Sequence, residues 1–92
     1  MGYRIELEEI EAALNTISNV DEACVVYKKI NLNMGFIYAF ISSKNRVNIE
    51  FVKSELKLIL PNYMIPKKIV ILDFLPKNAA GKIDRNNLKA QI

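Results

Sequence analysis

Residues 36–42, with the sequence FIYAFIS, constrain the fold of this 92-residue chain more than any other segment. Their aromatic and β-branched side chains alternate onto both faces of an extended chain, so they predict a central strand that is covered on both sides. Residues 20–29 are rich in valine and tyrosine and predict a second strand, which the turn at 31–35 joins to the first in a hairpin. Residues 69–75 (IVILDFL) predict a third strand.

Two segments have the apolar spacing of amphipathic helices. Residues 6–17 place an apolar side chain every three or four positions, with acids between them. Residues 48–60 do the same, with Asn48 as the predicted N-cap and Pro61 at the helix end. Asp84 is predicted to cap a short final helix. This order of elements predicts an α+β domain, a sheet of about three strands flanked by helices.

Composition narrows the class of protein. The chain has no histidine, so the commonest general base and metal ligand are missing. No apolar run is long enough to span a bilayer and no secretory signal is visible, which favours a cytoplasmic protein. The single cysteine, Cys24, lies in an apolar strand and is expected to be buried. Residues 67–92 hold six bases and two acids, a balance that suits a phosphate-bearing partner or simply a solvated face.

The segment 79–85 (AAGKIDR) places a lysine directly after three small residues. Gly81 permits unusual backbone angles, and Lys82 puts a compact positive charge on a long stem, so the segment predicts a slack, projecting loop that delivers a cation. It is not a phosphate-binding P-loop, because Ile83 follows the lysine and the upstream glycine is missing. Taken alone, the same residues also fit a surface turn with a solvated lysine.

Three separated segments decide between these interpretations. They are 2–11 (GYRIELEEIE), 60–66 (LPNYMIP) and 75–85 (LPKNAAGKIDR). In this order and at these separations they resemble the C-terminal subdomain of the adenylate-forming enzymes. That superfamily includes acyl-CoA synthetases, peptide-synthetase adenylation domains and D-alanine:carrier-protein ligases. The resemblance covers essentially all of residues 1–92, and the first segment is most similar to the peptide-synthetase and carrier-protein-ligase branches.

The resemblance implies an activity and a set of site residues. Enzymes of this superfamily join a carboxylate to ATP, giving an acyl-adenylate and pyrophosphate, with Mg²⁺ held by a large N-terminal subdomain. They then pass the acyl group to a thiol of phosphopantetheine or coenzyme A. Lys82 matches the catalytic lysine, and Gly81 lies with it on the ATP or AMP side. Gly2, Tyr3 and Arg4 match a segment that lines the path of the thiol arm, although Tyr3 also fits core packing.

The hinge residue and the nucleotide-binding motifs of the large subdomain are absent from this sequence. We therefore expect residues 1–92 to be a mobile lid subdomain that is inactive alone. The expected partners are the large subdomain and a carrier protein, with no nucleic acid, membrane or bound metal. The alternatives are a free-standing module that binds RNA, another polyanion or a protein, and a structural remnant without activity.

Several residues near these motifs are expected to have structural rather than catalytic roles. The acids of the first helix are expected to form a solvated face; they are Glu6, Glu8, Glu9 and Glu11. Three residues between the prolines are expected to pack rather than bind a ligand: Tyr63, Met64 and Ile65. Arg85 is expected either to brace the Lys82 loop or to contact the large subdomain.

Overall fold

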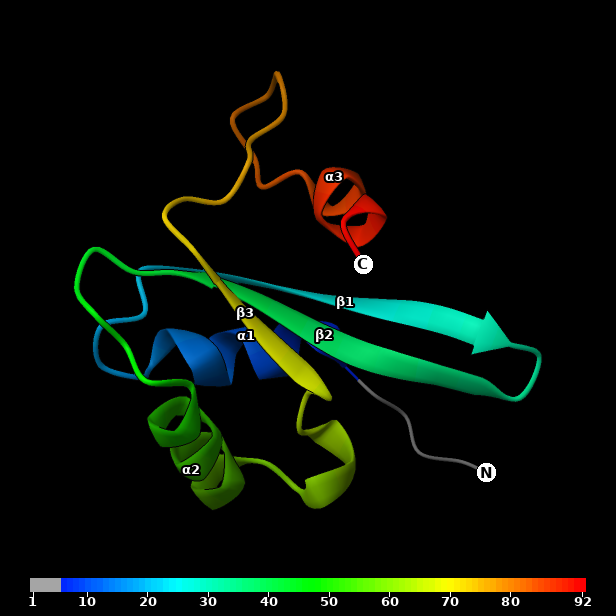
Figure 1. Cartoon of the computed structure of the whole chain (residues 1–92), viewed down its shortest axis with the longest axis horizontal. Coiled ribbons are helices and arrows are strands. Elements are labelled where there is room, and N and C mark those ends of the chain that lie inside the picture. The colour runs from blue at the N-terminus through cyan, green and yellow to red at the C-terminus, as the bar shows by residue number, and fades with distance from the viewer. Residues whose placement is uncertain (1–5) are drawn as a thin grey trace.

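The computed structural model describes residues 6–92 and shows an α+β fold, as the sequence predicts (Figure 1). Its elements, in chain order, are α1 (Leu7–Asn15), β1 (Glu22–Asn31), β2 (Met34–Ser42), α2 (Ile49–Ile59), a 3-10 turn η1 (Asn62–Met64), β3 (Lys68–Leu72) and α3 (Arg85–Ala90). Among the described residues, none of the helices has both the length and the apolar composition that a membrane span requires.

The strand β2 is the centre of the sheet, which confirms the prediction for residues 36–42. The strand order is β1-β2-β3, with β2 antiparallel to β1 and parallel to β3. Ala39 pairs with Val25 on one side and with Ile69 on the other. The predicted hairpin of β1 and β2 is therefore present, and β1 is left as an edge strand.

Each face of the sheet has its own core. In Figure 1, α1 and α2 lie below the strands and α3 lies above them. The first core joins α1 and α2 to the lower face through Ile10, Leu14, Val52, Leu56 and Ile41. The second core joins α3 to the upper face through Cys24, Phe40, Leu75 and Leu88. The long apolar segment 36–42 thus supplies side chains to both cores, which explains why it lacks a polar face.

The predicted caps are confirmed, but the third strand is shorter than predicted. Asn48 Oδ1 accepts from the Glu50 and Phe51 amides at 2.7 and 3.2 Å, and Asp84 Oδ1 accepts from the Asn87 amide at 3.1 Å. The strand β3 ends at Leu72, which pairs with Ser42, the last residue of β2. Since β2 offers no further partner, the chain leaves the sheet there.

Candidate functional site

The Lys82 loop, residues 77–82, is part of the segment between β3 and α3 and extends away from the body of the domain (Figure 1, orange). All six residues are exposed. At the base of the loop, Lys77 and Ile83 form an antiparallel bridge, and the Asp84 amide donates to the Pro76 carbonyl at 2.8 Å. The loop therefore projects from a closed, hydrogen-bonded base.

Asn78 organises the interior of the loop. Its backbone N–H donates to the Lys82 carbonyl at 2.7 Å, and its carbonyl accepts from the Gly81 amide at 2.9 Å. Its side-chain Oδ1 accepts from the amides of Ala80 and Lys82 at 2.9 and 3.1 Å. The Asn78 side chain thus satisfies backbone donors that the sheet and helices leave unpaired, a feature that the expectation of a slack loop did not include.

The Lys82 amine is free to meet a ligand. The side chain is exposed, and within residues 6–92 it makes no hydrogen bond or ion pair. Gly81 immediately before it has a φ of 81°, a left-handed conformation that favours glycine. Lys77, five residues earlier in the same loop, differs because its amine pairs with Glu22 Oε2 at 3.1 Å. The loop thus presents one unpaired cation.

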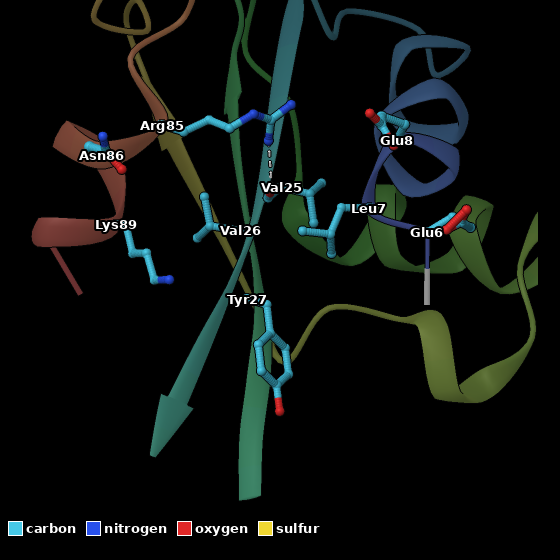
Figure 2. Close-up of a pocket in the computed structure, with 9 residues that line it drawn as sticks. All are labelled: Glu6, Leu7, Glu8, Val25, Val26, Tyr27, Arg85, Asn86 and Lys89. Carbon is cyan, nitrogen blue, oxygen red and sulfur yellow. Dashed lines mark hydrogen bonds between the residues drawn. The ribbon is translucent and has the colours of Figure 1, made fainter. Parts of the chain in front are cut away.

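Arg85 fixes the C-terminal side of the loop to the body of the domain. Figure 2 shows its side chain reaching from α3 to the edge strand β1, where Nη1 donates to the Val25 carbonyl at 2.8 Å. The guanidinium also binds Glu11 of α1 through Nη1 and Nη2, at 2.6 Å from Oε2 and 3.0 Å from Oε1. The hydrogen bond with Glu11 raises the pKa of Arg85 further above its ordinary value, so the guanidinium stays charged.

These contacts correct one expectation and refine another. Glu11 is not part of a solvated face: its side chain is only 14% exposed, and Oε2 also accepts from the Val25 amide at 2.7 Å. Glu8 and Glu9 are exposed, as predicted. Arg85 braces the sheet edge and α1 rather than the tip of the Lys82 loop.

A groove of about 550 Å³ runs along the free edge of β1, between the start of α1 and α3 (Figure 2). Val25, Val26 and Tyr27 form its strand side. Acidic side chains from the start of α1 and the basic Arg85 and Lys89 line its opposite walls. The groove lies beside Arg85, and none of the residues of the Lys82 loop lines it.

The sequence of this chain matches a known protein family. The family model described as the AMP-binding enzyme C-terminal domain matches residues 9–82. The chain belongs to this family. It is thus a C-terminal domain of the adenylate-forming enzymes, as its three sequence segments predict.

The relatives of this AMP-binding C-terminal domain are much longer proteins. Bacitracin synthase 2 of Bacillus licheniformis is 44% identical over 84 residues, 90% of this chain and 3% of that protein. Surfactin synthase subunit 1 of Bacillus subtilis (strain 168) is 45% identical over 87 residues, 95% of this chain and 2% of that protein. The solved structure of holo-AB3403, a four-domain nonribosomal peptide synthetase bound to AMP and glycine, has a TM-score of 0.83 at 35% identity, covering 92% of this chain and 6% of that chain.

The remaining predicted residues of the domain divide into two groups. Gly2, Tyr3 and Arg4 lie outside the described residues. Of the three residues expected to pack, Met64 is buried and Ile65 packs against the first core, whereas Tyr63 is exposed. Asn78 was not among the predicted site residues, although an asparagine two residues before a backbone donor in a glycine-containing loop is a recognised turn signal.

Proposed function

We propose that this AMP-binding C-terminal domain is the mobile lid of an ATP-dependent carboxylate-activating ligase and that Lys82 is its catalytic residue. The observation that supports this most directly is the unpaired, exposed amine at the end of an ordered, projecting loop.

The proposed role of Lys82 is electrostatic. In the activation step, the carboxylate oxygen attacks the α-phosphorus of ATP and pyrophosphate leaves, which gives an acyl-adenylate. Two anions must approach each other for this attack. A positioned ammonium group offsets this repulsion and stabilises the negative charge that gathers at phosphorus. The lysine transfers no proton in this role. Gly81, which has no side chain, lets the loop backbone approach the nucleotide closely.

The proposed reaction needs groups beyond residues 1–92. We assign ATP, the acid and their Mg²⁺ to a large N-terminal subdomain, because the resemblance to adenylate-forming enzymes places the nucleotide-binding motifs there. The acyl acceptor is a phosphopantetheine thiol, on a carrier protein as in peptide synthetases or on coenzyme A. Gly2, Tyr3 and Arg4 are proposed to line the path of that thiol arm once the lid has rotated.

An exchange assay tests the role of Lys82. The domain is joined to a large adenylation subdomain, and carboxylate-dependent exchange of pyrophosphate with ATP is measured. We expect Lys82→Ala to lower the exchange rate about 100-fold or more, and transfer from a pre-made acyl-adenylate to stay close to wild type. The matched control is Lys77→Ala, which removes an equal charge from the same loop and should leave exchange unchanged. Equal rates for Lys82→Ala and wild type would refute the proposal.

A further inference from the structure

We propose that Asn78 is a positioning residue that aims the Lys82 side chain. This inference rests on the proposed catalytic role of Lys82 and extends it to a neighbouring residue. Asn78 holds both polar groups of the Lys82 backbone. Its Oδ1 accepts from the Lys82 N–H at 3.1 Å, and its own N–H donates to the Lys82 carbonyl at 2.7 Å.

Hydrogen bonds rather than packing give the loop its shape. Ala79, Ala80, Gly81 and Lys82 are all exposed. A methyl group added at Gly81 would meet no atom within 4 Å apart from those of the two adjacent residues, so no other side chain packs against the loop at that point. When no neighbouring side chains pack against an exposed loop, only its internal hydrogen bonds limit its conformation. Of the four bonds made by Asn78, two belong to the side chain and disappear when it is truncated.

The position of an ammonium group matters for the proposed reaction. Lysine is a point charge on a flexible stem, so the loop backbone sets where that stem begins. A displacement of about 1 Å in a reacting group can lower a rate by about 100-fold. Loss of the Asn78 side chain leaves the charge of Lys82 intact but lets its backbone N–H move. Truncation of the Asn78 side chain should therefore slow adenylation even though the net charge of the loop is unchanged.

The test compares three variants of the domain joined to a large adenylation subdomain. Asn78→Ala removes the acceptor, whereas Asn78→Ser keeps a neutral acceptor oxygen that forms the same kind of turn more weakly. The control is Asn86→Ala, an exposed asparagine on α3 whose side chain makes no hydrogen bond within residues 6–92. We expect Asn78→Ala to lower kcat for pyrophosphate exchange about tenfold with KM for ATP within about twofold. Asn78→Ser should recover to within about threefold of wild type, and Asn86→Ala should match it.

A second measurement separates positioning from a general loss of structure. Transfer from a pre-made acyl-adenylate and the urea midpoint of unfolding should both be unchanged in Asn78→Ala. Adding Asn78→Ala to Lys82→Ala should cause no further loss of exchange, because a positioning residue acts only through the group that it positions.

The outcomes distinguish the two proposals. Wild-type exchange in Asn78→Ala, an equal loss in both half-reactions, or a further loss in the double variant would each overturn the role of Asn78. If Lys82→Ala is impaired in the same experiment, the role of Lys82 still stands. Wild-type exchange in Lys82→Ala would instead refute the proposed function itself, together with the inference that depends on it.

Discussion

Arg85 Nη1 lies 2.6 Å from Glu11 Oε2, and this ion pair joins the last helix of the domain to the first. The same two side chains occupy the free edge of β1 at Val25, where Arg85 donates to the carbonyl and Glu11 accepts from the amide. An uncovered strand edge is a template for pairing with another chain. The pair therefore closes this point of the edge while it anchors α3, the element that follows the Lys82 loop.

Arg85→Ala is expected to lower the free energy of unfolding by about 1 kcal/mol. The figure is modest because the Arg85 side chain is 48% exposed, so water replaces part of each lost contact. The change also leaves Glu11, a largely buried carboxylate, without its guanidinium partner. Urea denaturation followed by circular dichroism measures the difference.

Two variants serve as controls for the Arg85 prediction. Lys89→Ala removes a charge from the same helix and should leave the midpoint nearly unchanged, because the Lys89 side chain makes no hydrogen bond or ion pair within residues 6–92. Arg85→Lys should recover only part of the loss, since an ammonium group cannot bind both carboxylate oxygens and the Val25 carbonyl in one plane. Full recovery by lysine would show that charge alone matters here.

Local patterns predicted the elements of this fold well. The central position of residues 36–42 followed from side chains that are apolar on both faces, and the caps at Asn48 and Asp84 followed from residue type at a helix start. Each of these signals depends on neighbours within a few residues. The end of β3 was missed because it depends on where the partner strand β2 stops, at Ser42.

The contacts around the site depend on residues far apart in the chain. Glu11 and Arg85 are separated by 74 positions, and nothing near either residue distinguishes Glu11 from the exposed acids Glu8 and Glu9. A helix pattern places Glu11 on the flank of α1 but does not say that α3 returns beside it. The sequence motifs could therefore propose Lys82 as a candidate site residue, whereas the contacts that hold the C-terminal side of its loop required the three-dimensional structure.

The buried thiol of Cys24 should make the stability of the domain depend on pH. Burial raises the pKa of this thiol above its ordinary value, so the native state keeps a proton that the unfolded chain releases. The stabilising contribution is fully present below the unfolded pKa of about 8.5 and is lost as the pH rises through the native pKa. In that window the free energy of unfolding should fall by at most about 1.4 kcal/mol per pH unit from this group.

The measurement is the difference in unfolding free energy between wild type and Cys24→Ala at pH 7.5 and at pH 9.5. Lysine and tyrosine side chains titrate in both proteins, so their contributions largely cancel in the difference. We expect the advantage of wild type to shrink at the higher pH. A difference that stays constant or grows would contradict a raised thiol pKa at this buried position.

Gly81 has a left-handed backbone conformation in the Lys82 loop, so substitutions at this position should strain the backbone. Its φ of 81° is costly for residues with a side chain, by roughly 1–2 kcal/mol, although open space surrounds the position. Gly81→Ala should therefore fail through backbone strain and not through a clash. The loop is exposed and can shift instead of bearing the full cost, so we expect the free energy of unfolding to fall by no more than about 1 kcal/mol.

Gly81→Ala should slow pyrophosphate exchange even though it lowers stability little. The reason is that a loop that relaxes its backbone strain also displaces Lys82. Gly81→Asn is the matched comparison, since asparagine adopts the left-handed conformation more readily than alanine despite its larger side chain. Exchange should therefore follow the order glycine, asparagine, alanine. The reverse order of the two variants would show that side-chain size at the nucleotide, and not the backbone angle, is what position 81 restricts.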